Sequence, residues 1–525
     1  MLLNSFLSES AKRFGEKAAV ITKDRQLSYA QLDDLSNRLA NGLLSGQIAR
    51  QDRVAVYLEN SLESAVSIFG ILKAGGVFLV INPQVKKKKL QYILNDCQVR
   101  VLITDKKGAG ELNDPSFQAP HLKTVLVADY GLSANLEHPF TVQQVENKPD
   151  LLVKTLCGFI ERSSDAVPPE NAIDIDLAAL IYTSGSTGDP KGVMMTHTNI
   201  VTASRSITGY LENVQDDVIL NTLPLSFDYG LYQMIMSVQF GGTIVLQRQF
   251  LYPFEYVQQI INYKATALPL VPAMAAILLQ LKGIREYDFS HVRYITNTGQ
   301  ALPPAHIMQL QEIFPNARIY SMYGLTECKR VSYLHPAELH RRPNSVGKAM
   351  PNTEVWLVDG EGRKITEPDT VGELVIRGAH VMKGYWKKPL ETDKVLREGV
   401  YPQERVLYSG DYFKMDEEGF LYFVSRKDDM IKSGGERISP REIEDVLYEH
   451  PEISEVAVIG VPDEILGYAI KAVVVLKDGT QIGESELSAF CSSRLERARV
   501  PKYIEFMERL PKSHSGKIKK TALAE

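Results

Sequence analysis

The chain has 525 residues, of which 44% are hydrophobic and 23% are charged. This composition is typical of a globular protein, and the length exceeds what one ordinary core holds, so we expect more than one domain. The net charge of −5 gives no support to nucleic-acid binding. No uninterrupted apolar run approaches the ~18–20 residues that span a bilayer. The four cysteines are scattered and show no metal-ligand spacing. We therefore expect a cytoplasmic protein that binds neither nucleic acid nor membrane.

Strand-like and helix-like segments alternate through the first part of the chain. Strand-like runs at residues 53–58, 77–80 and 99–104 are separated by helical patterns at residues 61–74 and 89–96. That βαβαβ order predicts an α/β fold with a parallel sheet and crossover helices. The same rhythm returns in a second set of strand-like runs, at residues 218–223, 243–247, 267–270, 292–297 and 318–320.

The pattern changes after about residue 340. Strand-like runs at residues 355–358, 372–377 and 419–424 are spaced like those of an antiparallel or barrel-like subdomain. Beyond Arg426, about 100 residues of α+β character are the right size for a separate domain. Its predicted elements are a helix at residues 440–449, strands at 453–461 and 470–476, and a helix at 484–496. We expect a core at residues 1–425, a hinge at 426–428 and a C-terminal lid at 429–525.

The segment Tyr182-Thr-Ser-Gly-Ser-Thr-Gly-Asp-Pro-Lys-Gly192 follows a short apolar run that predicts a buried strand. Its glycines let the backbone approach a ligand, so that successive N–H groups point at an anion. Its hydroxyls and Lys191 add donors that suit a polyphosphate. A Walker A sequence is absent. A mobile Ser/Gly linker is the alternative, but linkers rarely place a proline and a lysine directly after a strand.

This segment resembles the phosphate loop of the adenylate-forming superfamily, which includes acyl-CoA synthetases, adenylation domains of nonribosomal peptide synthetases and firefly luciferase. The resemblance implies a large N-terminal domain of mixed sheets with packed helices and a small, mobile α+β C-terminal domain. It also implies that ATP is a substrate. The loop residues that would contact the nucleotide are Thr183, Ser184, Gly185, Ser186, Thr187, Gly188 and Lys191.

A second motif, Met322-Tyr-Gly-Leu-Thr-Glu327, follows a predicted strand. Taken alone, an acidic residue after a strand is typical of a surface turn. The segment also resembles the family's Tyr-Gly-x-Thr-Glu motif, which implies that Tyr323 stacks on adenine and Thr326 contacts the α-phosphate. By the same resemblance Glu327 holds Mg²⁺, a hard cation that prefers oxygen ligands.

Two further segments resemble the family's ribose and hinge motifs. In Tyr408-Ser-Gly-Asp411, the carboxylate of Asp411 would accept hydrogen bonds from both ribose hydroxyls. In the second motif Ser425 replaces the usual glycine, and Arg426 and Asp428 are kept. The resemblance places Arg426 at the nucleotide and makes Asp428 the residue whose torsions change as the lid rotates. A charged interdomain linker is the alternative for this second motif.

Near the C-terminus, Ser513-His-Ser-Gly-Lys-Ile-Lys-Lys520 resembles the family's ending, which makes Lys517 the catalytic lysine. The chemistry requires such a group. Attack of a carboxylate on the α-phosphate of ATP brings two anions together, and a lysine between them lowers that barrier. Lys517, Thr183 and Glu327 are therefore the expected catalytic residues.

The segment Leu223-Pro-Leu-Ser-Phe-Asp-Tyr-Gly-Leu-Tyr232 carries Asp228 where amino-acid-activating domains place a substrate-binding aspartate. A buried carboxylate without a partner costs roughly 3–5 kcal/mol. A fatty acid would leave Asp228 in that state, whereas Asp228 and Lys517 together would clamp an amino acid. An exposed or helix-capping aspartate is the alternative. The pocket is expected to be small and mainly apolar, with Arg330 nearby as a source of charge, and its expected lining is Tyr229, Tyr232, Pro269, Thr296, Thr298, Gly299, Met322 and Val331.

The same segment, together with Tyr-Gly-Leu-Thr-Glu-Cys-Lys-Arg, resembles stand-alone L-proline–carrier-protein ligases. That resemblance implies formation of prolyl-AMP and pyrophosphate, then transfer to the phosphopantetheine thiol of a separate acyl or peptidyl carrier protein in natural-product biosynthesis. The alternative is an AMP-forming acyl-CoA synthetase that acts on a simple carboxylic acid with CoA. A nucleotide-binding sensor without catalysis is a third hypothesis, which Lys517, Glu327 and Asp411 disfavour.

Overall fold

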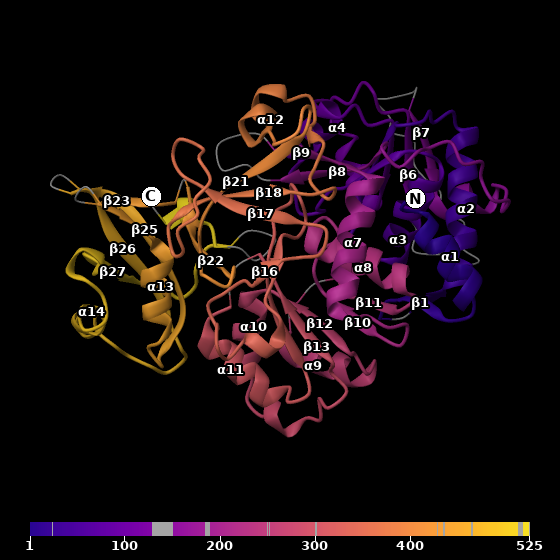
Figure 1. Ribbon diagram of the computed structural model, residues 1–525. Coiled ribbons are helices and arrows are strands. Elements are labelled where there is room, and N and C mark those ends of the chain that lie inside the picture. The colour runs from indigo at the N-terminus through magenta and orange to yellow at the C-terminus, as the bar shows by residue number, and fades with distance from the viewer. Residues whose placement is uncertain are drawn as a thin grey trace.

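The computed structural model describes residues 1–23, 25–128, 151–183, 190–248, 250, 252–299, 302–427, 429–433, 436–463, 466–512 and 518–523. Within these residues the strands form four sheets (Figure 1). Two large sheets and an antiparallel sheet make up most of the molecule, and a smaller sheet with its own helices lies at the C-terminal end.

The first large sheet confirms the predicted βαβαβ unit. Strand β3 (Arg53–Tyr57) pairs in parallel with β4 (Val77–Val80) and with β5 (Val101–Thr104). The crossover helices are α3 (Leu62–Lys73) and α4 (Lys87–Asp96), and Ser61 begins α3 with a capping box. The sheet runs in the order β19-β9-β8-β4-β3-β5-β6-β7 and also contains β6 (Thr124–Val127), β7 (Leu152–Thr155), β8 (Leu177–Thr183), β9 (Lys191–Thr196) and β19 (Gly384–Tyr385).

The second large sheet confirms the second set of predicted strands. Strands β10 (Val218–Asn221), β12 (Ala267–Leu270), β13 (Tyr294–Asn297) and β14 (Arg318–Tyr323) are parallel neighbours. Their carboxyl ends therefore meet at one edge, where ligands bind in open α/β sheets. The other strands of this sheet are β1 (Ala18–Ile21), β2 (Gln26–Ser28), β11 (Thr243–Leu246), β15 (Ser332–Tyr333) and β16 (Lys348–Ala349).

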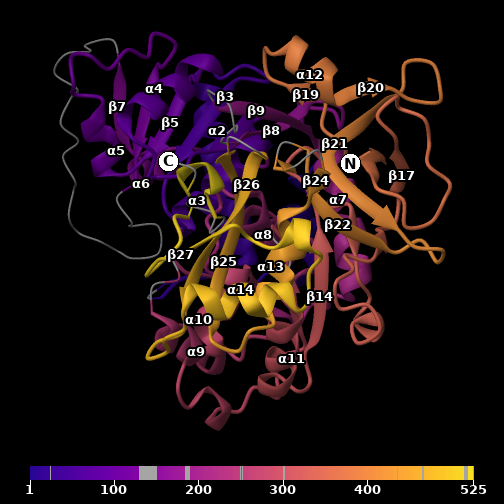
Figure 2. The ribbon, with the colours of Figure 1, turned by 90° about the vertical axis from the view of Figure 1, so that its left-hand side faces the viewer.

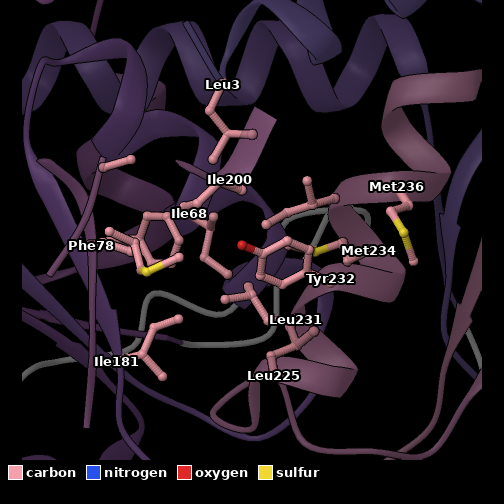
Figure 3. Packing of buried hydrophobic residues seen from close by; sticks show 14 of the residues in the cluster. Leu3, Ile68, Phe78, Ile181, Ile200, Leu225, Leu231, Tyr232, Met234 and Met236 are labelled. Carbon is pink, nitrogen blue, oxygen red and sulfur yellow. The ribbon is translucent and has the colours of Figure 1, made fainter. Parts of the chain in front are cut away.

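The largest apolar core joins the two large sheets. It includes side chains of both sheets and of the helices α3, α7 (His197–Leu211) and α8 (Asp228–Phe240). Figure 3 shows Tyr232 of α8 facing Ile200 of α7 and Ile68 of α3. Further helices of this part of the chain are α1 (Ser5–Phe14), α2 (Tyr29–Ser45), α5 (Lys106–Glu111), α6 (Leu156–Glu161), α9 (Pro253–Asn262), α10 (Pro272–Leu279), α11 (Pro304–Ile313) and α12 (Pro389–Val395).

The antiparallel sheet confirms the predicted change of pattern after residue 340. Its strands are β17 (Glu354–Val358), β18 (Gly372–Arg377), β20 (Leu396–Glu398), β21 (Arg405–Met415) and β22 (Leu421–Arg426). The pairing of β21 with β22 sets Asp411 opposite Arg426. This register brings together two residues that the sequence assigns to the nucleotide.

The C-terminal part folds around a separate apolar cluster, so the fold is mixed α/β with a large N-terminal domain and a small C-terminal one, as predicted. Figure 2 looks onto the small domain. Gln280 Nε2 of the large domain donates to Ser454 Oγ of the small one at 2.8 Å. The elements of the small domain are α13 (Pro440–Tyr448), α14 (Glu484–Ser492), β23 (Ile431–Ser433), β24 (Glu436–Ile438), β25 (Ile453–Asp463), β26 (Gly467–Leu476) and β27 (Tyr503–Phe506).

Gly230, in the first turn of α8, lies where the backbone of residues 223–224 approaches the helix closely. A Cβ atom at Gly230 would lie 2.4 Å from the Pro224 carbonyl oxygen and 2.6 Å from that of Leu223. We expect Gly230→Ala to lower the free energy of unfolding by about 2–3 kcal/mol, measured by urea denaturation. Gly209→Ala in α7 is the matched control, because a Cβ there meets nothing within 4 Å. Equal stability of the two variants would contradict the close contact between Gly230 and the Leu223 and Pro224 carbonyl oxygens.

Candidate active site

The two ends of the predicted phosphate loop lie side by side. Thr183 at the end of β8 is paired with Lys191 at the start of β9. The preceding residue, Tyr182, donates from its hydroxyl to Asp96 Oδ2 at 2.5 Å, which anchors the end of β8 to α4. The loop residues Ser184, Gly185, Ser186, Thr187 and Gly188 lie outside the described residues.

Tyr385 connects the phosphate loop with the motif that contains Glu327. Its hydroxyl donates to Glu327 Oε1 at 2.7 Å, and Lys191 Nζ lies 5.2 Å from the centre of its ring. The backbone supports this arrangement, because Tyr385 in β19 is paired with Val193 in β9 and the Met382 N–H donates to the Glu327 carbonyl at 2.7 Å. Burial and the Glu327 carboxylate both raise the pKa of Tyr385, so the phenol stays a donor.

The predicted nucleotide residues Tyr323, Asp411 and Arg426 form one cluster. The Tyr323 hydroxyl donates to Asp411 Oδ2 at 2.6 Å, and Arg426 Nε lies 3.8 Å from Asp411 Oδ1. The Tyr323 ring packs edge-on against Phe413, with centroids 4.8 Å apart. Burial, followed by the Asp411 charge, raises the pKa of Tyr323 well above its ordinary value. Thr326 lies partly buried in the same turn as Glu327.

The predicted pocket residues gather at the carboxyl edge of the second large sheet. The Tyr229 hydroxyl donates to the Thr296 carbonyl at 2.9 Å and lies 2.7 Å from Thr296 Oγ1. The Tyr210 hydroxyl, which the sequence does not single out, donates to Met322 Sδ at 3.0 Å. Gly299, just after β13, has a φ of 91° that favours glycine. The residues Tyr229, Tyr232, Thr296, Thr298, Met322 and Val331 are all buried.

Asp228 already has a cationic partner. Lys329 Nζ lies 3.0 Å from the Asp228 carbonyl oxygen and 3.5 Å from its carboxylate Oδ2. The side chains of Asp228 and Lys329 are 11% and 1% exposed. The carboxylate also lies in the first turn of α8, where the helix dipole stabilises negative charge. The expectation that a fatty acid would leave Asp228 unpaired is therefore wrong, because Lys329 supplies the missing charge.

Lys329 is itself in an unusual environment. Its Nζ lies 4.7 Å from the Tyr232 ring centre and 5.2 Å from the Tyr229 ring centre. Burial lowers the pKa of Lys329 from 10.5 to about 7, and the Asp228 carboxylate offsets only part of that effect. The neighbouring Arg330 guanidinium lowers this pKa further. One cation thus pairs with the Asp228 carboxylate, and a second, Arg330, lies nearby in a pocket that the sequence predicts to be mainly apolar.

The sequence does not single out three residues of this site, Tyr210, Lys329 and Tyr385. Lys329 directly follows Cys328 in the Glu327 motif, so a basic pair beside a buried strand was the available signal. Tyr385 stands in Lys383-Gly-Tyr-Trp386, a short aromatic segment after an antiparallel strand. Two predicted residues, the catalytic Lys517 and the hinge residue Asp428, lie outside the described residues.

Glu327 could hold the predicted Mg²⁺. The described residues contain no group of three or more His, Cys, Asp or Glu side chains that could form a metal cage. A single carboxylate suits Mg²⁺, which is usually bound by one or two carboxylates together with substrate phosphates. Glu327 therefore fits such a site when ATP supplies the remaining oxygens.

Among the described helices, none has the length and apolar character needed to cross a bilayer.

Comparison with known families accounts for this geometry. Residues 7–386 match the model of the AMP-binding enzyme family, and residues 442–517 match the AMP-binding enzyme C-terminal domain. The chain belongs to this family. The protein is accordingly an AMP-forming acid–thiol ligase that binds ATP.

Several curated relatives of this AMP-binding enzyme align over nearly their whole length. A long-chain-fatty-acid–CoA ligase of Bacillus subtilis strain 168 is 34% identical, with 100% of this chain and 94% of the relative covered. A long-chain-fatty-acid–CoA ligase of Escherichia coli O157:H7 is 30% identical, with 98% and 93% covered. These relatives are named as fatty-acid–CoA ligases, not as the L-proline–carrier-protein ligases that the two pocket segments resemble.

Solved structures of the family have the same fold. The anthranilate CoA ligase AuaEII in complex with anthranoyl-AMP gives a TM-score of 0.89 at 26% identity, with 100% of this chain and 96% of that chain covered. ATP-bound MatB from Rhodopseudomonas palustris gives a TM-score of 0.86 at 26% identity, with 100% and 98% covered. The likeness extends through both the large and the small domain.

The contact between Tyr385 and Glu327 predicts the effect of removing one hydroxyl. Tyr385→Phe frees the Glu327 carboxylate to turn, and a hydrogen bond to a charged group contributes about 1.5–3 kcal/mol. We expect ATP–pyrophosphate exchange to slow about tenfold or more and to need more Mg²⁺ for its half-maximal rate. Tyr401→Phe, on an exposed ring, is the control. An unchanged Mg²⁺ dependence in Tyr385→Phe would refute the positioning role.

The lowered pKa of Lys329 predicts a pH-dependent stability. Between pH 7 and 10.5 the unfolded chain holds the lysine proton and the folded protein has lost it, so the free energy of unfolding rises with pH. We expect the free energy of unfolding of the wild-type protein, relative to that of Lys329→Met, to rise by about 1 kcal/mol per pH unit between pH 8 and 10. Urea midpoints measure this gain. Lys12→Met, at an exposed lysine, should give a curve parallel to the wild type, and a parallel curve for Lys329→Met would contradict the burial effect.

Proposed function

We propose that this enzyme activates a carboxylic acid without an α-amino group as its acyl-AMP and transfers the acyl group to CoA. The observation that carries the proposal is the ion pair between Asp228 and Lys329. While Lys329 carries its proton, it neutralises the carboxylate, so an acid without an ammonium group leaves no unpaired charge at Asp228. The names of the full-length relatives, which are fatty-acid–CoA ligases, support the same substrate class.

The charge count at the pocket also disfavours an amino acid. Lys329 already places a cation beside Asp228, and the nearby Arg330 guanidinium lowers the pKa of Lys329. A substrate ammonium at Asp228 would add a second cation to a carboxylate that already has one, in a buried site. Like charges at such distances repel strongly where water is excluded.

We assign the residues of the site the following roles in adenylate formation. Thr183 and Lys191 bind the ATP phosphates together with the loop between them, and Asp411 binds the ribose. Tyr323 packs against the adenine. Glu327, oriented by Tyr385, would hold Mg²⁺, which neutralises phosphate charge when bound. Lys517 bridges the attacking carboxylate and the α-phosphate, where negative charge increases in the transition state.

We place the hinge at residues 426–428, between a core at 1–425 and a lid at 429–525. Two contacts on the core side support this assignment. The Lys427 N–H donates to the Gly410 carbonyl at 2.8 Å, and Lys427 Nζ donates to Glu373 Oε2 at 3.1 Å. Because the chain is fixed up to Lys427, Asp428 is the residue whose torsions change as the lid rotates. This rotation carries Lys517 to and from the site.

A second candidate is activation of an amino acid, L-proline foremost, and its transfer to the phosphopantetheine of a carrier protein. The observation that favours it is the pKa of Lys329, which is about 7. A neutral Lys329 would release the Asp228 carboxylate to bind a substrate ammonium. The segments around Asp228 and Glu327, which resemble those of L-proline–carrier-protein ligases, support the same candidate.

The two candidates differ in substrate and in thiol acceptor. ATP–pyrophosphate exchange is measured with the twenty amino acids and with short, medium, long and aromatic carboxylic acids. The accepted acid is then offered with CoA and with a phosphopantetheinylated carrier protein, and the thioesters are identified by mass spectrometry. We expect exchange with simple acids and an acyl-CoA product. Exchange confined to L-proline with thioester on the carrier alone would overturn the proposal.

Lys517 is tested by separating the two half-reactions. We expect Lys517→Ala to slow acyl-AMP formation by at least about a hundredfold, because it removes a charge from the transition state. Conversion of supplied acyl-AMP to acyl-CoA should change much less. Lys519→Ala, at an exposed lysine two positions away, is the matched control for both half-reactions. Equal losses in both half-reactions would contradict the assigned role.

A further inference from the structure

Arg330 is a buried cation whose hydrogen-bonding capacity is not filled. Its side chain is among the largest in the core, and the residue is 1% exposed. Within the described part of the chain, neither Nε nor Nη1 of Arg330 has a hydrogen-bond partner. Burying a charge with unsatisfied donors costs several kcal/mol, so such a side chain is rarely retained for packing alone.

The guanidinium lies among residues of the predicted acid pocket. Its Cζ is 5.8 Å from the ring centre of Tyr229, whose hydroxyl bonds Thr296. On another side lies Tyr210, whose hydroxyl donates to Met322. Burial raises the pKa of Tyr210, and the nearby Arg330 guanidinium acts in the opposite direction. Arg330 therefore lies beside residues of the predicted acid pocket.

Charge balance indicates what the guanidinium binds. The buried group consists of the Asp228 carboxylate and the Lys329 and Arg330 cations, and Asp228 is paired with Lys329. Arg330 thus remains without an anionic partner among the described residues. One additional carboxylate would neutralise it and would accept hydrogen bonds from its free nitrogens. Charge-assisted bonds of this kind are the strong class of hydrogen bond.

We propose that Arg330 binds a second carboxylate of the substrate, so that the enzyme activates one end of a compact dicarboxylic acid. This inference rests on the proposed function and names its substrate class. The reacting carboxylate would face the ATP site, and the second carboxylate would accept from Nε and Nη1 of Arg330. A plain alkyl chain would instead leave the guanidinium buried and unpaired.

The test compares acids of equal length with the wild-type protein. ATP–pyrophosphate exchange is measured with butanoate and succinate, pentanoate and glutarate, and hexanoate and adipate. We expect kcat/KM for at least one dicarboxylate to exceed that of its monocarboxylate partner about tenfold or more. A preference for the monocarboxylate in all three pairs would overturn the inference and leave the proposed function standing. Exchange with amino acids alone would overturn both.

Variants of Arg330 identify the residue responsible. We expect Arg330→Met to lower kcat/KM for the dicarboxylate about a hundredfold and to raise it for the matched monocarboxylate. Arg330→Lys should restore part of the dicarboxylate preference. Arg341→Met, at an exposed arginine in the same region, should leave the preference unchanged. Equal losses for both acids in Arg330→Met would overturn the inference, and the wild-type comparison decides it if that variant does not fold.

Discussion

The ion pair between Lys329 and Asp228 is the contact on which the rest of the site depends. It joins the turn after β14 to the first turn of α8, across 101 residues of sequence. The turn is tightly closed, because the Val331 N–H donates to the Tyr323 carbonyl at 2.9 Å and a Cβ at Gly324 would lie 2.2 Å from the Lys329 carbonyl oxygen. Once the turn is fixed, Glu327 meets Tyr385 on one side and Lys329 meets Asp228 on the other.

The turn after β14 lies between the residues assigned to the nucleotide and the residues of the acid pocket. On the nucleotide side, strand register sets Asp411 opposite Arg426, and Tyr385 links Glu327 to Lys191. On the acid side, tyrosine rings enclose a carboxylate and two cations. The nucleotide residues are rich in hydrogen bonds, whereas the acid pocket is buried and short of anions.

Much of the fold could be predicted from the sequence, because its signals are local, and the motifs assigned to the nucleotide select residues that the structure brings together. The βαβαβ order predicts the parallel sheet of β3, β4 and β5, and short motifs single out Thr183, Glu327 and Asp411 as candidates. The acid pocket could not be predicted in the same way. The partner of Asp228 is Lys329, which is remote in sequence and meets it only when β14 and α8 pack together. The sequence alone therefore predicts that a substrate ammonium neutralises the Asp228 carboxylate.

The central claim is that Lys329, and not the substrate, neutralises Asp228. A matched pair of adenylate analogues tests it most directly: prolyl-sulfamoyladenosine and cyclopentanecarbonyl-sulfamoyladenosine, which differ at the ring position that carries the ammonium. Calorimetry on the wild-type protein at pH 6, where Lys329 with its pKa of about 7 is protonated, gives both dissociation constants. The cyclopentane analogue should bind about tenfold more tightly or better, because a second cation at a carboxylate already paired with Lys329 is unfavourable. Tighter binding of the prolyl analogue would contradict the account and return Asp228 to the role of ammonium partner.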